Sequence, residues 1–238
     1  MKRKHTNPII FALDVGSLEE AQWFVDELKD WVWGFKIGKE LFTWMGPKVV
    51  EMVQAKGGKV FLDLKYHDIP VTVAKASSMA TKLRVSMFDL HAFGGLEMMR
   101  MAMEASKEVA RKDGLPPPAI LAVTILTSLR EVDLQELGIA KSLEEEVIYL
   151  SKLAQMAGLD GVIASPLEIE TLRRACGEDI VIVTPGVRPK KSLQHDQARV
   201  MSPREAVKAG ADFLVIGRPI RDAANPLEAT KEILKEIE

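Results

Sequence analysis

Apolar residues occur along this chain in two patterns that alternate from one end to the other. Short continuous runs, such as 9–13 and 213–216, precede longer stretches in which apolar positions recur every three or four residues, as in 18–28. A short run bounded by turn residues is typical of a buried parallel strand, and the second pattern is typical of an amphipathic helix. The pattern predicts strands at residues 9–15, 33–38, 60–65, 87–91, 119–126, 161–164, 180–184 and 213–216.

Helix-start signals follow several of these strands. Ser17, Ser142, Ser165 and Ser202 each precede a glutamate by three residues, the capping-box spacing in which both side chains satisfy free backbone N–H groups. We also expect one helix containing residues 41–53, one that begins near residue 70, and a last helix over 226–237. A further helix after residue 95 is rich in methionine, which we interpret as core and subunit packing: Met98, Met99, Met101 and Met103.

Eight strand-then-helix units in 238 residues predict a closed (β/α)8 TIM barrel, an α/β fold in which a single domain spans residues 1–238. No Gly-x-Gly-x-x-Gly fingerprint supports an open dinucleotide-binding sheet. Apolar residues are spread evenly, with no break where a second domain would begin.

The composition narrows the possible partners. Lys and Arg total 32 against 34 Asp and Glu, a formal net charge of -2, and they are scattered among acidic residues, which argues against a nucleic-acid surface. Cys176 is the only cysteine, so neither an intrachain disulfide nor a zinc site is indicated, and a reducing cytoplasm fits. The apolar run at 8–13 is too short for a signal peptide, and we expect no membrane-spanning segment.

Charged residues stand at the ends of the predicted strands. Asp63 and Lys65 are two residues apart and project from the same face of a strand that otherwise reads as buried, with Asp68 just beyond it. An unpaired charge in a core is costly, so this face is expected to meet a polar cavity in which Asp63 keeps Lys65 protonated. A structural ion pair is the simpler explanation, but the third charge at short spacing favours a functional site.

In a TIM barrel the carboxyl ends of all strands share one face, where active sites lie. Each charged or polar residue at a strand exit can be explained alone as a cap, a turn former or a surface charge. If all of them had only such structural roles, their occurrence at one strand exit after another would be a repeated coincidence. The residues expected to converge are Asp14, Lys36, Asp63, Lys65, Asp68, Thr127, Arg188 and Arg218.

The last two strand exits carry glycine and arginine, at 186–188 and 217–218. Glycine lets backbone N–H groups approach a ligand, and arginine offers a bidentate fork, in the loops where this fold commonly holds a phosphate. We therefore expect a phosphate-bearing ligand. Charges of alternating sign are expected on the other side of the barrel mouth, from Lys36, Asp63, Lys65 and Asp68. These charges would keep both lysines cationic and would place a carboxylate beside a proton donor, which suits a reaction through a carbanion.

Seven motifs then occur in order: Ala-Leu-Asp at 12–14, Phe-Lys-Ile-Gly-Lys-Glu at 35–40, Phe-Leu-Asp-Leu-Lys-Tyr-His-Asp-Ile-Pro at 61–70, Thr-Ile-Leu-Thr-Ser at 124–128, Thr-Pro-Gly-Val-Arg-Pro at 184–189, Asp-Gln-Ala-Arg at 196–199 and Val-Ile-Gly-Arg-Pro at 215–219. Through them the chain resembles, over essentially its whole length, the bacterial-type orotidine 5'-phosphate decarboxylase family. The resemblance implies conversion of orotidine 5'-monophosphate to UMP in de novo pyrimidine biosynthesis, without a metal or a cofactor.

The resemblance also implies roles for individual residues. Lys65 would protonate the pyrimidine carbon as carbon dioxide leaves, and Lys36, Asp63 and Asp68 would complete the catalytic network, with Asp68 reaching the neighbouring site of a homodimer. Substrate binding is implied for Asp14, Lys36, Asp63, Thr72, Thr127, Arg188, Gln197, Gly217 and Arg218. Gln197 lies in the polar segment 189–200, whose length at a strand exit makes it a lid candidate.

Two residues depart from the family pattern. Val71 stands where asparagine is common, and Phe93 stands where a small residue is expected. Neither has an implied chemical role, so we expect at most altered packing. We interpret His67 and His91, near the mouth, as residues that hold the backbone rather than as an acid or a base.

Two alternative functions stay open. A magnesium-dependent sugar-phosphate decarboxylase or aldolase of the same superfamily would share the Asp63-x-Lys65-x-x-Asp68 spacing, and a non-catalytic barrel that binds a phosphate ligand would share the glycine and arginine exits. Lys36, the His-Asp-Ile-Pro continuation at 67–70 and the complete charged set favour the metal-free decarboxylase over both.

Overall fold

Eight parallel strands close into a barrel in sequence order in the computed structural model, which describes residues 7–189 and 201–238. Each strand pairs with its sequence neighbours and β8 pairs with β1, so the predicted (β/α)8 barrel is confirmed. The strands are β1 (Ile9–Ala12), β2 (Gly34–Ile37), β3 (Val60–Tyr66), β4 (Met87–His91), β5 (Ala119–Val123), β6 (Gly161–Ile163), β7 (Val181–Pro185) and β8 (Phe213–Ile216).

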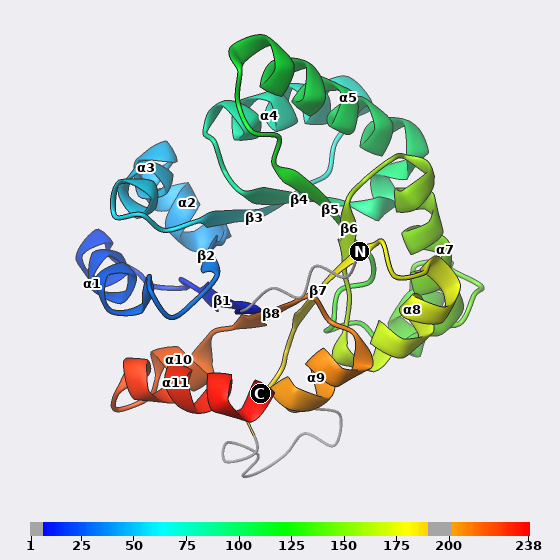
Figure 1. Cartoon of the computed structure of the whole chain (residues 1–238). Helices are drawn as coiled ribbons and strands as arrows, with labels where there is room; N and C mark the ends of the chain where they lie inside the picture. The colour runs from blue at the N-terminus through cyan, green and yellow to red at the C-terminus, as the bar shows by residue number, and fades with distance from the viewer. Residues whose placement is uncertain (1–6, 190–200) are drawn as a thin grey trace.

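Helices form a ring around the barrel (Figure 1). They are α1 (Leu18–Leu28), α2 (Lys39–Met45), α3 (Pro47–Ala55), α4 (Pro70–Lys82), α5 (Gly95–Asp113), α6 (Glu131–Glu136), α7 (Leu143–Met156), α8 (Ile169–Cys176), α9 (Pro203–Ala209), α10 (Arg218–Arg221) and α11 (Pro226–Ile237), with single 3-10 turns at η1 (Ala92–Gly94) and η2 (Pro166–Glu168). Ser142, Ser165 and Ser202 form complete capping boxes, and Ser17 accepts the Glu20 N–H. Of the helices in the described ranges, none has the length and apolar character needed to cross a membrane.

Some elements differ from the sequence-based expectation. The single helix expected over 41–53 is divided into α2 and α3, because Gly46 turns the chain at a φ of 59° and Pro47 starts a new helix. Two short helices, α6 and α10, lie beyond β5 and β8, where the pattern predicted none. β1 and β5 end at Ala12 and Val123, earlier than predicted, so the polar residues that follow them lie in loops.

The core has two apolar layers. One fills the barrel interior and includes Ile10, Phe61 and Phe213, and the other lies between the strands and the surrounding helices. Met98, Met99 and Met103 of α5 are buried in the outer layer, which confirms the core part of their interpretation. The interior layer ends below the carboxyl ends of the strands, so the polar side chains at the next inward positions border an open cavity.

Candidate active site

A cavity of about 210 Å³ lies at the C-terminal end of the barrel. It is lined by Lys36, Phe61, Asp63, Lys65, Val123, Ile125, Leu126, Thr127, Ile163, Ala164, Pro185 and Val215. The charged groups come from β2 and β3, whereas the wall formed by β5 to β8 and their exits is mainly apolar. This arrangement suits an organic ligand that turns polar groups towards the charges and an apolar part towards the opposite wall.

Four side chains form a continuous series of ion pairs at this end of the barrel. Lys36 Nζ lies 2.9 Å from Asp14 Oδ1 and 3.2 Å from Asp63 Oδ2. Lys65 Nζ pairs with the other carboxylate oxygen of Asp63. The structure therefore brings together the four residues that the sequence placed at the exits of the first three strands.

An irregularity in β3 directs Lys65 into this series. The pairing of β3 with β4 passes from Leu62–Phe88 to Tyr66–Leu90, so three residues of β3 lie opposite Asp89 alone. Lys65 has a φ of 52°, in the left-handed region that lysine rarely adopts. Its N–H has lost a regular ladder partner and donates instead to Asp89 Oδ1 at 2.8 Å.

Charges and burial together set the ionisation of the series. Burial by itself raises the pKa of Asp63, but the Lys36 ammonium, a side-chain hydrogen bond with Asp89 and the Lys65 ammonium lower it to about 2. Burial also opposes the charged form of Lys36, but Asp63 and Asp14 outweigh burial and raise the pKa of this lysine. At neutral pH Asp63 is therefore a carboxylate on the wall of the cavity.

Asp89 of β4 is a site residue that the sequence analysis missed. Its side chain is fully buried, and Oδ2 lies 3.8 Å from Lys65 Nζ. The available signal was an acid at an inward-facing position of the apolar strand Met87–His91, the same signal that marked Asp63. It was overlooked because it lies inside the strand rather than at its exit.

Two of the predicted residues lie outside this cavity in the single chain. Asp68 is exposed just after β3 and accepts the N–H of Ile69 at 2.6 Å. Thr72 is exposed in the first turn of α4. Neither residue lines the cavity of its own chain.

The predicted phosphate-binding residues lie at the exits of β7 and β8. Gly186 has a φ of 79°, and the Arg188 N–H donates to Met201 O at 3.1 Å. Gly217 caps α10 beside β1, where an added Cβ would lie 3.3 Å from the Cβ of Ala12. Arg218 is exposed at the first position of α10. Gln197 and most of the lid candidate lie outside the described residues.

Arg221 of α10 is a second residue that the sequence analysis missed. Its guanidinium donates to the backbone carbonyl of Asp14 at 2.9 Å and pairs with Asp222 at 2.7 Å. It thereby ties the loop after β1 to the exit of β8, 207 residues away in sequence. No local pattern marks such a contact, because it depends on closure of the barrel.

The histidines near the mouth belong to a stack of rings. The ring centroids of His67 and His91 are 5.4 Å apart, and those of His91 and Phe93 are also 5.4 Å apart, with both pairs stacked. Burial, followed by the charges of His67, Lys65 and Lys39, lowers the pKa of His91 to about 4. His91 is therefore neutral at neutral pH. Its Nδ1 is buried and has no hydrogen-bond partner in the described part of the chain, so the backbone contact expected of this residue is not seen at that atom.

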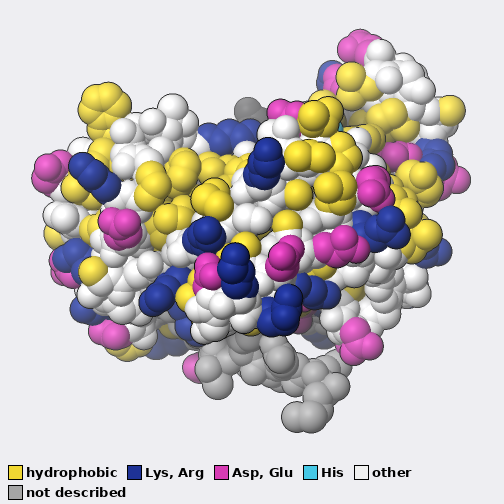
Figure 2. All heavy atoms as spheres, turned by 90° about the horizontal axis from the view of Figure 1, so that it is seen from above, with side chains coloured by type: hydrophobic (Ala, Val, Ile, Leu, Met, Phe, Trp, Pro, Cys, Tyr) yellow, Lys and Arg dark blue, Asp and Glu magenta, His cyan; other side chains and the backbone are white. Residues whose placement is uncertain are grey.

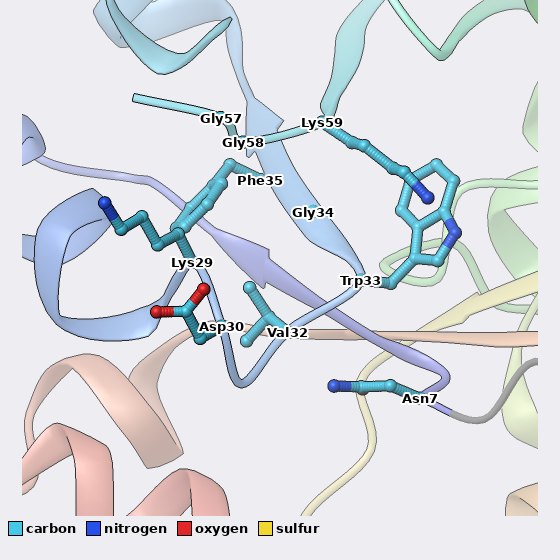
Figure 3. Close-up of a pocket in the computed structure, with 10 residues that line it drawn as sticks. All are labelled: Asn7, Lys29, Asp30, Val32, Trp33, Gly34, Phe35, Gly57, Gly58 and Lys59. Carbon is cyan, nitrogen blue, oxygen red and sulfur yellow. The ribbon is translucent and has the colours of Figure 1, made fainter. Parts of the chain in front are cut away.

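A second cavity, of about 370 Å³, lies at the opposite end of the barrel, where β2 and β3 begin (Figure 3). The Lys59 ammonium lies 5.2 Å from the centroid of the Trp33 ring, and Asn7 caps the start of β1 through the N–H of Ile9. The N-terminal end of this fold serves stability in characterised TIM barrels, so we place the candidate active site at the other end.

Within 7–189 and 201–238, no three His, Cys, Asp or Glu side chains are grouped so that they could hold a metal ion.

Comparison with known proteins gives consistent results. The family model described as "Orotidine 5'-phosphate decarboxylase / HUMPS family" matches residues 7–233. Two proteins named orotidine 5'-phosphate decarboxylase, from Pelobacter propionicus and Trichlorobacter lovleyi, are 55% and 54% identical to this chain. The first alignment covers 96% of this chain and 94% of the relative, and the second covers 97% and 95%.

Solved structures give the same picture. The crystal structure of orotidine 5'-phosphate decarboxylase from Lactobacillus acidophilus has a TM-score of 0.86 and 35% identity, covering 98% of this chain and 99% of that one. The structure of the Pyrococcus horikoshii OT3 enzyme of the same name has a TM-score of 0.75 and 27% identity, with 96% and 98% covered.

Proposed function

The chain belongs to the orotidine 5'-phosphate decarboxylase / HUMPS family, and we propose that it converts orotidine 5'-monophosphate to UMP and carbon dioxide in pyrimidine biosynthesis. The observation that carries the proposal is the ion-pair series of Asp14, Lys36, Asp63 and Lys65, of which the last three line the cavity. It places a carboxylate and a proton donor next to each other, as loss of a substrate carboxylate followed by protonation requires.

In the proposed step, the bond between pyrimidine C6 and the carboxylate breaks, and its electron pair stays on C6. Lys65 Nζ then delivers a proton to C6, and carbon dioxide leaves. Asp63, ionised beside the substrate carboxylate, repels it in the ground state and loses that repulsion as neutral carbon dioxide forms. Lys36 holds Asp63 in place from the other side at 3.2 Å.

We assign the remainder of the nucleotide to the neighbouring strand exits. Asp14 and Lys36 would hold the ribose hydroxyls, and Thr127 of the cavity wall would contact the nucleotide. The phosphate would lie at the exits of β7 and β8, against Arg188, Gly217 and Arg218, with Gln197 from the lid candidate. Phosphate contacts remote from C6 would drive closure and so contribute binding energy to the reacting centre.

We further propose that the working unit is a homodimer in which Asp68 and Thr72 enter the partner's site. Both residues are exposed, and exposed apolar side chains occur before α4, on α4 and in the η1 turn: Ile69, Val71, Met79 and Phe93. Figure 2 views the side on which α4 and α5 lie in Figure 1, and hydrophobic side chains gather on this face between charged ones. An apolar patch around a polar catalytic residue supports a subunit interface. Val71 and Phe93, the two departures from the family pattern, belong to this patch.

We propose a cytoplasmic location and a reaction that needs neither a metal nor a cofactor. The test is the ultraviolet absorbance of orotidine 5'-monophosphate mixed with purified protein, with and without EDTA, as the orotate chromophore disappears. We expect conversion to UMP at the same rate in both. Conversion that EDTA abolishes would contradict the metal-free mechanism, and nucleotide binding without conversion would favour the non-catalytic barrel.

A further inference from the structure

Asp89 is the one fully buried acid that touches the catalytic series in the described part of the chain. Its Oδ1 is satisfied by the Lys65 N–H, but its Oδ2 has no hydrogen-bond donor there. The Lys65 ammonium lies 3.8 Å from Oδ2, beyond hydrogen-bond distance. A buried acceptor without a donor is costly, so the chemical form of this carboxyl group needs an explanation.

If Asp89 Oδ2 carries a proton, it is a hydrogen-bond donor rather than a buried acceptor that lacks one. The Lys65 ammonium lies against Asp63 Oδ1 and 3.8 Å from Asp89 Oδ2, so the two carboxyl groups lie close together and repel each other strongly if both are ionised. Asp63 is the member held ionised, because Lys36 and Lys65 both pair with it. Burial, followed by the charge of Asp63, raises the pKa of Asp89 well above its usual range.

The charge balance agrees. With Asp89 neutral, the ammonium groups of Lys36 and Lys65 balance the carboxylates of Asp14 and Asp63. An ionised Asp89 would add an unbalanced buried charge, and would hold the Lys65 ammonium away from the cavity.

We propose that Asp89 acts as a neutral carboxylic acid, which accepts the backbone N–H of Lys65, donates its own proton to Asp63, and so positions the proton donor. The carbonyl oxygen of the Asp89 carboxyl group accepts the Lys65 N–H and so holds Lys65 in its left-handed conformation. The O–H of the same group donates to Asp63 and so fixes the carboxylate that orients the Lys65 ammonium. Asp89 is a positioning residue: it does not line the cavity. Its effect on turnover rests on the proposed function, whereas its protonation does not.

Three variants test whether Asp89 needs to accept the Lys65 N–H and donate a proton to Asp63 as a neutral group. Asp89→Asn keeps an acceptor oxygen for Lys65 and supplies an N–H donor to Asp63, so we expect kcat within about threefold of wild type at neutral pH. Asp89→Leu has a similar size and neither group, so we expect kcat to fall about 100-fold with little change in KM, as for a misplaced catalytic group. Asp89→Ala serves as the smaller alternative if the leucine variant does not fold, as judged by circular dichroism.

The kinetics of these variants test both the protonation state of Asp89 and its positioning role. A loss in Asp89→Asn as large as in Asp89→Leu would overturn the neutral-acid form, because asparagine cannot replace a carboxylate counterion. Wild-type kcat in a folded Asp89→Leu or Asp89→Ala protein would overturn the positioning role. If wild type itself fails to decarboxylate orotidine 5'-monophosphate, the proposed function fails, and protonation is decided by the next measurement alone.

The direct test is the infrared carbonyl band of a protonated carboxylic acid in the ligand-free protein between pH 7 and 8. We expect wild type to show a band that Asp89→Asn lacks. The pKa of Glu168 is raised to about 7, mainly by burial, so the comparison is repeated in a Glu168→Gln background to remove a second source. The same spectrum with and without Asp89 would overturn the proposal.

Discussion

At the residue scale, the site depends on a backbone conformation that the lysine side chain disfavours. Lys65 has a positive φ, which costs about 1–2 kcal/mol for a residue with a Cβ. The hydrogen bond from its N–H to Asp89 and the pairing of its ammonium with Asp63 offset this strain. Strain at one residue, over-determined by its neighbours, is commonly part of a catalytic arrangement.

Replacement of Lys65 tests its role as proton donor. Lys65→Ala is expected to lower kcat by at least about 100-fold, the lower end of what a positioned acid contributes, while the protein stays folded. The measurement is orotidine 5'-monophosphate turnover together with circular dichroism. Lys59→Ala is the matched control, because Lys59 lies at the opposite end of the barrel and should retain full activity. Near-normal turnover by a folded Lys65→Ala protein would remove the assignment.

Protonation of Asp89 also has a consequence for stability. Its folded pKa is raised above the ordinary value of 3.8, so the folded state binds more protons than the unfolded state at higher pH. The free energy of unfolding therefore falls as pH rises above about 4, by up to about 1.4 kcal/mol per unit, until the folded pKa is passed.

Asp89→Asn lacks this dependence. We expect its free energy of unfolding, from urea denaturation between pH 5 and 8, to gain steadily on that of wild type as pH rises. A constant difference across that range would mean that Asp89 titrates normally in the folded protein.

At the element scale, the barrel interior is filled so closely around β6 that this strand requires glycine. Gly161 of β6 faces inward between β5 and β7, where an added Cβ would collide with the Val181 carbonyl and lie 2.8 Å from a Leu121 methyl group. A backbone carbonyl cannot move aside without shifting the β6–β7 pairing.

Gly161→Ala is accordingly expected to destabilise the protein by about 1–3 kcal/mol or more, the usual cost of overpacking. Gly16→Ala is the control, because nothing lies within 4 Å of its added Cβ and it should leave stability unchanged or slightly raised. Denaturant midpoints measure both. Equal midpoints for the two variants would show that β6 and β7 can separate without cost.

At the scale of the whole molecule, we propose that Asp68 of one chain completes the site of a second chain. A mixture of Lys65→Ala and Asp68→Ala subunits tests this directly. In a mixed dimer, one site would carry both substitutions, and the other would combine an intact Lys65 with an intact Asp68 from its partner. Because half of randomly mixed dimers are heterodimers, about a quarter of all sites should regain activity.

Refolding the two inactive variants together, followed by the turnover assay, supplies the measurement. Each variant refolded alone is the control. If Asp68 acted within its own chain, every site in the mixture would lack one residue, and co-refolding would restore no activity.

The sequence by itself determined the barrel and most of the charged series. A short apolar run indicates a strand, and a capping residue indicates the start of a helix. The alternation of inward and outward positions along β3 indicates which of its charges face the barrel interior. All three signals can be read from the sequence because each extends over only a few residues. The family motifs added the expected roles of residues such as Asp68, which no local pattern could assign.

Tertiary structure alone decided how those residues meet. The irregular register of β3 against β4, the left-handed Lys65 and the hydrogen bond from its N–H to Asp89 arise from pairing between strands, so they have no signature in either segment alone. The contact of Arg221 with the Asp14 carbonyl needs the ends of the chain to meet. Local propensity specifies which helices and strands form. The orientation and the protonation state of a buried side chain depend instead on neighbouring groups, which only the closed barrel brings next to it.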